Sequence, residues 1–210
     1  ILADDFSWQG RRADSRQLHR RWIDLVRSDP RADPTSRLLA DTYQAGLDFA
    51  DQEFDRALAG YRDVLPRLRA AFLDDRIAAR DLVGPLTDYA YPRRSQGDSR
   101  EAERSFREAL VLAPKLSPHE YYLVSTVRST LASTLADQGQ FEEALITARQ
   151  AVAEFDAEQR RDMPDAGFAL NILGGFLTEV GDEVGAAAML ARGEALIRHR
   201  LGAKHLWLGD

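Results

Sequence analysis

The fold is decided by the stretch GQFEEALITARQAV at residues 139–152. Its first glycine recurs 42 residues earlier as Gly97 and 42 residues later as Gly181. Each of the three glycines is followed five residues on by an alanine: Ala102, Ala144 and Ala186. A register kept over three copies indicates that one supersecondary unit repeats along the chain. A stack of such units offers an extended surface rather than a reaction centre.

The repeating unit is predicted to be a helical hairpin. Apolar residues follow Gly139 at spacings of three and four, as one face of a helix requires: Phe141, Ala144, Leu145, Ala148, Ala151, Val152 and Phe155. A second stripe of the same kind precedes the glycine: Tyr122, Val124, Val127, Leu131, Leu135 and Ala136. Gly139 lies between the two stripes, where a tight reversal favours a residue that tolerates positive φ. No alternating pattern typical of a β-strand occurs in the chain.

Capping signals mark several helix starts. Residues 117–120 read Ser-Pro-His-Glu, a capping box with proline at the first helical position. Asp98 and the pair Asp33-Pro34 predict two further starts, and Pro164 is expected to open a helix that runs to Val180.

Two prolines interrupt the pattern before Gly97. Pro85 and Pro92 fall inside a predicted helix, where each removes a backbone donor and crowds the preceding turn. We therefore expect a kinked or shortened helix here, either a tolerated irregularity or a functional bend.

The composition is that of a folded, soluble protein. The chain has 210 residues, of which 44% are hydrophobic and 30% charged, and its net charge of −6 with interspersed signs argues against a nucleic-acid partner. Cysteine is absent, which excludes disulfides and thiolate metal sites. No apolar run is long enough to span a membrane. Only two of the 28 basic residues are lysines, Lys115 and Lys204, which we interpret as the arginine-rich usage of a GC-rich bacterium.

No catalytic constellation is found. The histidines His19, His119, His199 and His205 are dispersed, and no metalloprotease, P-loop or dinucleotide motif occurs. The pair Gly174-Gly175 is interpreted as a close helix crossing rather than a phosphate cradle. We therefore predict that the chain is not an enzyme and binds no metal or cofactor.

The spacing of glycine, alanine and aromatic residues resembles the tetratricopeptide repeat. The best copy has these residues: Ala90, Gly97, Ala102, Phe106, Ala109, Leu110 and Pro114. The 42-residue period resembles the kinesin-light-chain-type variant, and the ending Leu201-Gly202 with His205 is similar to its repeat end. HEAT and armadillo arrays have similar periods but lack this register of glycine and alanine.

The resemblance implies an all-α, right-handed α-solenoid of stacked antiparallel helical hairpins. We expect one array, 1–210, with approximate repeats at these boundaries: 1–32 (degenerate), 33–74, 75–116, 117–161 and 162–202, followed by the start of a further repeat at 203–210.

The family's peptide-binding groove, lined by the first helix of each hairpin, maps onto eleven positions. They are Thr87, Tyr91, Arg94, Thr126, Ser129, Ser133, Asp137, Phe168, Asn171, Gly175 and Thr178. Tyr91 and Phe168 are expected to anchor a peptide, and Asn171 to hydrogen-bond its backbone. The alternative for these residues is simple solvent exposure.

Three functional hypotheses follow. The first is a non-catalytic protein–protein interaction module that binds a peptide or protein segment in the groove. The second is the C-terminal sensory or regulatory array of a bacterial signalling protein, such as a Ser/Thr kinase or a winged-helix transcription regulator. The start at Ile1 suggests a piece of a larger protein, cytoplasmic or, if a membrane span precedes it, periplasmic. The third is a homodimer through the truncated C-terminal end, Leu206, Trp207 and Leu208.

Overall fold

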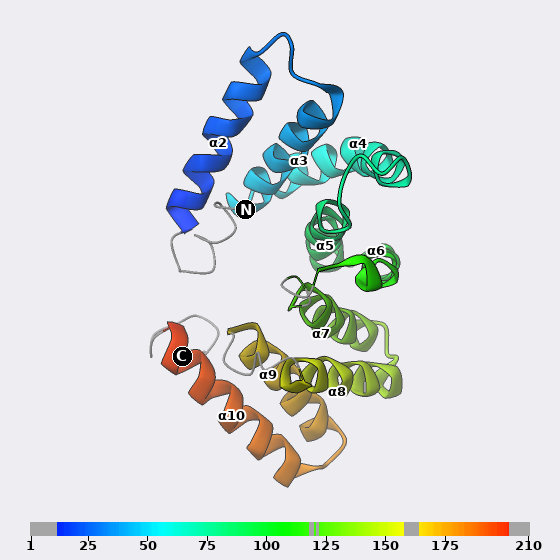
Figure 1. The fold of residues 1–210 in the computed structure, drawn as a ribbon. Helices are drawn as coiled ribbons and strands as arrows, with labels where there is room; N and C mark the ends of the chain where they lie inside the picture. Colours follow the sequence, from blue (N-terminus) through cyan, green and yellow to red (C-terminus); the bar gives the residue numbers. More distant parts are fainter. Residues whose placement is uncertain (1–11, 118–119, 121, 158–163, 202–210) are drawn as a thin grey trace. The chain divides into compact units, whose positions relative to one another are not determined.

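The computed structural model describes residues 12–117, 120, 122–157 and 164–201, and within them every regular element is helical (Figure 1). The elements are α2 (Arg12–Ser28), α3 (Pro34–Ala50), α4 (Phe54–Leu73), α5 (Arg80–Ser95), α6 (Ser99–Val111), the 3-10 helix η1 (Ala113–Lys115), α7 (Tyr122–Asp137), α8 (Phe141–Ala157), α9 (Pro164–Glu179) and α10 (Glu183–Leu201). The predicted all-α class is confirmed. None of these described helices has both the length and the apolar character that crossing a membrane requires.

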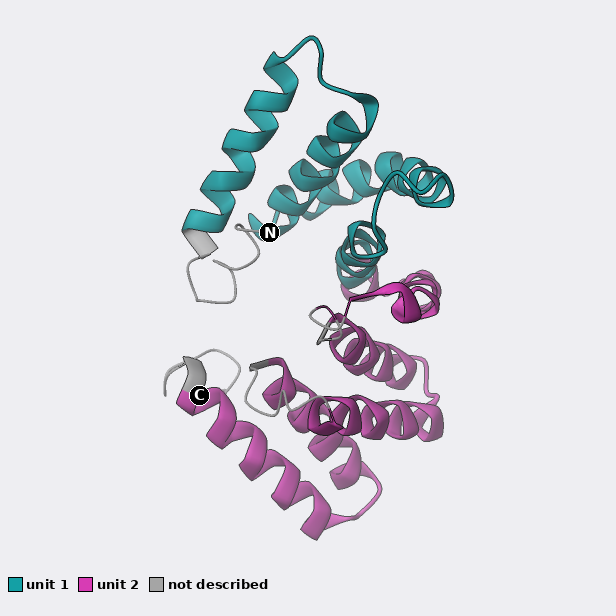
Figure 2. Ribbon diagram, viewed as in Figure 1, with its two compact units in different colours: residues 1–92 teal, residues 93–210 magenta. Residues whose placement is uncertain are grey.

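The chain divides into two compact units, Ile1–Pro92 and Arg93–Asp210 (Figure 2). In the first unit, α3 packs against α2 on one side and α4 on the other. In the second unit, α6 packs on α7, α7 on α8 and α9, and α9 on α8 and α10. Each unit is thus a succession of packed helices. The predicted repeat boundaries, and the interpretation of all residues as one array, stay predictions.

The predicted glycine turns are confirmed. Gly97, Gly139 and Gly181 have φ angles of +85°, +78° and +80°. After each glycine the next N–H donates back over the turn, and for Gln140 the acceptor is the carbonyl of Leu135 at 2.9 Å. This is the hydrogen bond of a Schellman motif, which ends a helix with a residue in the left-handed region.

The same turn also forms without glycine. Gln52, between α3 and α4, has φ of +65°, and the N–H of Glu53 donates to the carbonyl of Asp48 at 2.8 Å. Asp75 has φ of +54° after α4. A side chain in this region costs roughly 1–2 kcal/mol, so these turns are held by their surroundings.

Small residues let the two helices of a hairpin approach closely. Ala57, Ala102 and Ala144 are fully buried, and Ala186 is 4% exposed. They occupy equivalent places in α4, α6, α8 and α10, as the fourth residue of each second helix. Because these alanines have almost no exposed surface, a larger side chain would overpack the crossing, and the alanine register quoted above is interpreted as a packing requirement.

The crossing of α9 and α10 depends on glycine. A methyl group on Gly167 would lie 2.6 Å from Ile197, and one on Gly174 would lie 2.6 Å from Leu190. From the other helix, a methyl group on Gly193 would meet the carbonyl of Gly167 at 3.0 Å. The interpretation of Gly174 as a close crossing is therefore confirmed, whereas its neighbour Gly175 faces open space.

The capping signals at Asp33, Asp98 and Pro164 mark helix starts as predicted, whereas α7 begins at Tyr122, after the predicted capping box. Asp33 accepts hydrogen bonds from the backbone N–H groups of Thr35 at 2.9 Å and Ser36 at 3.0 Å, immediately before α3. Asp98 accepts from the N–H of Glu101 before α6. At the predicted capping box, the N–H of Ser117 donates to the Glu120 carboxylate at 2.9 Å. Helix α9 begins at Pro164 and ends at Glu179, one residue before the predicted end.

The expected shortening at Pro85 and Pro92 is wrong. Helix α5 has 16 residues, the same as α7 and α9, and it contains both prolines. Pro85 lies in the second turn of α5 and Pro92 in its last turn, so each removes a single backbone hydrogen bond near one end. The helix is retained because its apolar residues Leu82, Val83 and Leu86 are buried.

Replacing Ala144 by leucine should overpack the crossing of α7 and α8. Ala144 is fully buried, and the added volume should lower the free energy of unfolding by about 1–3 kcal/mol. The matched control is Ala153→Leu on the exposed side of α8, which should change stability by no more than about 0.5 kcal/mol. Urea denaturation of both variants measures the difference, and equal stabilities would contradict the crossing.

Two glycine-to-alanine substitutions should act with opposite signs. Gly139→Ala forces a side chain into the left-handed region and should destabilise the protein by about 1–2 kcal/mol. Gly175→Ala, inside α9 with no atom within 4 Å of its new methyl group, should stabilise it by roughly 0.5–1 kcal/mol. Thermal unfolding checks both signs, and a stabilising Gly139→Ala would be incompatible with the observed turn.

Candidate functional site

Two of the predicted groove residues have buried hydroxyl groups that are already hydrogen-bonded. The Thr87 hydroxyl donates to the carbonyl of Val83 in α5, and the Ser129 hydroxyl donates to that of Ser125 in α7, both at 2.8 Å. Thr42 makes the same bond to Leu38 in α3. Each of these hydroxyls donates within its own helix. They therefore contribute small side chains to the helix face but no free hydrogen-bond donor.

The neighbouring predicted positions on α7 are more open. Ser133 and Thr126 are half-buried. The Ser133 hydroxyl lies 3.5 Å from the carbonyl of Ser129, at the limit of a hydrogen bond. The Thr126 hydroxyl oxygen is buried and has no hydrogen-bond partner among the described residues. A buried hydroxyl without a partner costs free energy.

The two predicted groove charges of the second unit bind each other. The Arg94 guanidinium at the end of α5 donates through two nitrogens to the two carboxylate oxygens of Asp137 at the end of α7. This forked geometry is the strongest form of an arginine–carboxylate pair. Arg94 and Asp137 therefore offer a neutral, positioned pair rather than two separate charges.

The predicted residues of α9 differ in exposure. Phe168 is half-buried, whereas Gly175 and Thr178 are exposed. The Asn171 amide faces α10, because a methyl group on Gly193 would lie 2.3 Å from the Asn171 oxygen. Asn171 thus lies at the helix crossing, and its expected role with a peptide backbone stays a prediction.

A buried tyrosine and a carboxylate were missed by the sequence analysis. The hydroxyl of Tyr61 in α4, a residue with no exposed surface, donates to Asp88 of α5 at 3.0 Å. Burial raises the pKa of Asp88 from 3.8 to about 6, although the hydrogen bond from Tyr61 opposes the shift. Burial and the nearby carboxylates of Asp88 and Asp48 raise the pKa of Tyr61 well above its usual value. A carboxylate destabilised in this way is a candidate functional group.

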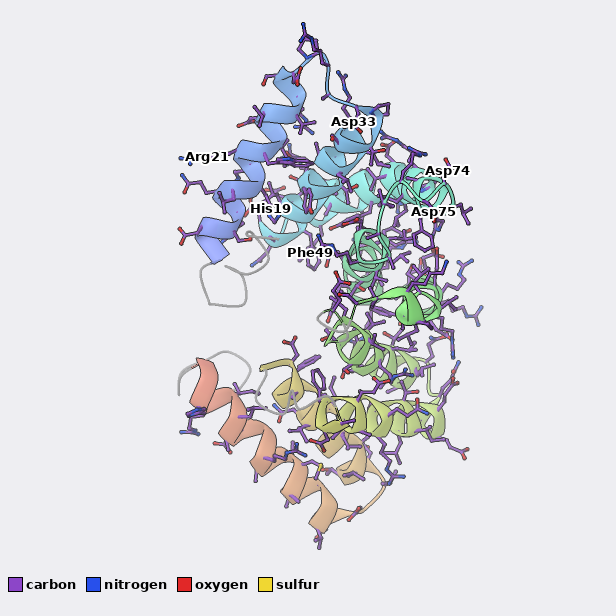
Figure 3. The ribbon with its side chains drawn as sticks, viewed as in Figure 1. His19, Arg21, Asp33, Phe49, Asp74 and Asp75 are labelled. Carbon is purple, nitrogen blue, oxygen red and sulfur yellow. The ribbon has the colours of Figure 1, made fainter. Side chains whose placement is uncertain are left out.

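Three aromatic rings lie near one another in the first unit. Phe49, labelled in Figure 3 at the end of α3, lies with its ring centre 6.3 Å from that of Tyr91 in α5 and 5.9 Å from that of Phe54 in α4. Phe54 is 40% exposed, and the other two are half-buried. The predicted anchor Tyr91 is therefore part of a larger aromatic surface.

A second aromatic group joins α2 to α3. His19 stacks on Tyr43 with ring centres 4.5 Å apart, and Trp22 meets the same ring edge-on at 5.4 Å. These rings pack beside the apolar cluster that includes Ile23, Val26 and Leu47. This position favours a structural role for His19. His119 and His205 lie outside the described residues, as do Leu206, Trp207 and Leu208.

Metal chemistry finds no support in the described part of the chain. Within it, no group of three or more histidine and acidic side chains is arranged to hold a metal ion.

Neither a family model nor a curated protein sequence matches the chain. Solved structures do match it. A Podosopora anserina protein with nearly identical TPR-like repeats, named for kinesin light chain, is 18% identical; the alignment covers 94% of this chain and 92% of that one, with a TM-score of 0.59. A variant of that protein gives a TM-score of 0.62 at 18% identity, over 95% of this chain and 93% of the other. BtubC (BKLC) from P. vanneervenii is 19% identical over 93% of this chain and 75% of its own, with a TM-score of 0.67.

These likenesses establish the fold. The chain is an α-solenoid of TPR-like helical hairpins. The kinesin-light-chain-type period and a bacterial source stay predictions.

The raised pKa of Asp88 makes stability depend on pH in a defined direction. The folded state holds the proton of the Asp88 carboxyl more tightly than the unfolded state does. The stabilisation from this protonated carboxyl is therefore fully present below about pH 4 and is lost as the pH rises through about 6. Asp88→Asn cannot ionise but can still accept from Tyr61. We expect the variant to exceed the parent protein in stability by about 1–3 kcal/mol at pH 7.5 and to match it at pH 4.

Urea denaturation of both proteins at the two pH values measures this difference. Asp24→Asn, at an exposed position of α2, is the control for the loss of one charge. A difference between Asp88→Asn and the parent that does not change with pH would contradict the raised pKa.

Proposed function

We propose that this chain is a non-catalytic protein-interaction module that binds a peptide or protein segment on its first helices. The observation that supports this most is the direct packing of α7 on α9, the first helices of two neighbouring hairpins. Helices packed in this way present one side in common, which an extended or helical segment can follow.

The side chains of this surface suit a segment that lies close to the helices. Ser133 and Gly175 are small, and Ser129 is small and buried. They leave room for a partner backbone, and Phe168 beside them offers an apolar contact. Large aromatic side chains provide much of the binding free energy in protein interfaces, so Phe168 and Tyr91 are the expected anchors of the second and first units.

The proposal is tested with peptides selected from a random library on the immobilised full chain. Isothermal titration should show that Phe168→Ala or Tyr91→Ala weakens the selected peptides by at least about ten-fold, since truncated anchor residues cost about 2 kcal/mol or more. The matched control is Phe141→Ala, because Phe141 is 56% exposed on a second helix, α8. Circular dichroism verifies that each variant is folded.

Two results would contradict the proposal. One is a selected peptide that loses affinity in Phe141→Ala and keeps it in both anchor variants, which would place the site on the second helices. The other is a library selection that yields no binding peptide.

A further inference from the structure

The aromatic surface of the first unit is bordered by two half-buried carboxylates. Seven other half-buried carboxylates pair with an arginine: Asp41, Asp81, Asp98, Glu101, Glu103, Glu154 and Asp156. Asp48 of α3 and Asp88 of α5 are half-buried as well, but neither makes an ion pair with any described residue. Burying a charge without a counter-ion is costly, and a cation supplied from outside would remove that cost.

Both carboxylates keep hydrogen-bonding capacity. One Asp88 oxygen accepts from the Tyr61 hydroxyl at 3.0 Å, and one Asp48 oxygen accepts from the Gln44 amide at 2.9 Å. In each case the second carboxylate oxygen accepts no hydrogen bond from the residues that the structure describes. An ionised carboxylate accepts up to about four hydrogen bonds, so each aspartate can still receive the N–H groups of a partner. Tyr61 is fully buried, and its hydrogen bond holds the Asp88 carboxylate in position.

The rings and the carboxylates share the same two helices. Tyr91 follows Asp88 by three residues in α5, which places the two side chains on one side of that helix. Asp48 of α3 lies near enough to Tyr61 for its charge to help raise the pKa of that tyrosine, which also donates to Asp88. The ring of Phe49, the next residue in α3, lies 6.3 Å from that of Tyr91. Aromatic faces attract cations, most strongly where water is partly excluded.

We propose that Phe49, Tyr91, Asp48 and Asp88 form a docking surface for an arginine side chain of the partner segment. The inference rests on the proposed function and specifies the chemistry of its partner. Charge complementarity selects a cation, and the rings select the planar guanidinium over the compact ammonium of lysine, since arginine stacks on aromatic faces and donates in a fork.

The test uses nuclear magnetic resonance of the full chain with N-acetyl-arginine amide as the probe. The control probe is N-acetyl-citrulline amide, which has nearly the same shape without the charge. The arginine probe should shift the backbone resonances of Phe49, Asp88 and Tyr91 in a saturable manner, and the citrulline probe should not. Asp88→Asn should weaken binding of the arginine probe about ten-fold, the effect of losing one charge-assisted hydrogen bond.

Two further variants keep the result interpretable. Asp24→Asn removes one negative charge from an exposed position of α2 and should leave the binding unchanged. Asp48→Asn tests the second carboxylate independently and should also weaken binding. Equal shifts with the two probes, or equal binding by Asp88→Asn and the parent protein, would overturn the inference.

The peptides selected in the previous section separate this inference from the proposed function. Replacing arginine by citrulline in such a peptide should reduce its affinity in the parent protein and have little further effect in Asp88→Asn. Peptides that depend on Tyr91 or Phe168 but contain no cation and ignore Asp88 would overturn the arginine site and leave the interaction module standing. Saturable binding of the arginine probe at Asp88 without any peptide ligand would support the arginine site and contradict the module.

Discussion

The close approach of the two helices in each hairpin is the constraint on which the rest of the structure depends. Ala57, Ala102 and Ala144 have no exposed surface, and each lies where the second helix of a hairpin meets the first. Between α9 and α10 the same approach requires glycine at 167, 174 and 193. Once the backbones are this near, the side chains around the crossing have one arrangement, because protein interiors are packed as densely as organic crystals. The outward sides of the first helices, where we place function, are fixed as a result.

Arginine–carboxylate pairs between helices help to align neighbouring helices with one another. Arg107 of α6 donates to Glu143 of α8 at 2.7 Å, and Arg128 of α7 donates to Glu154 of α8 at 2.8 Å. The exposed pair, Arg107–Glu143, adds no more than about 1 kcal/mol to stability. Their effect is to favour one alignment of neighbouring helices over its alternatives, since the planar fork of arginine accepts few geometries. Asp48 and Asp88 contrast with these pairs, because each accepts a hydrogen bond from a neutral side chain and neither makes an ion pair with a described residue.

The sequence predicted the architecture well because the features that determine it are local. Gly139 and its equivalents were recognised from spacing, and Asp33 and Asp98 from capping chemistry. The shortening expected at Pro85 and Pro92 was wrong, because burial of the apolar face of α5 outweighs the hydrogen bonds that proline removes, and the kink stays a prediction. Asp88 was missed although it adjoins the predicted Thr87, since its partner Tyr61 is 27 residues away and no repeat register links them. The signalling context, the compartment, the dimer and the eleven groove positions stay predictions.

The turn at Gln52 has a consequence for how such proteins diverge. It has the same left-handed backbone and the same returning hydrogen bond as the glycine turns, with a side chain that a repeat pattern would not contain. The turn therefore forms without its usual glycine, and the flanking helices hold the strained backbone of Gln52 in place. A turn of this kind therefore keeps the path of the chain where the sequence signature is missing. Solved structures likewise share this fold at 18% and 19% identity.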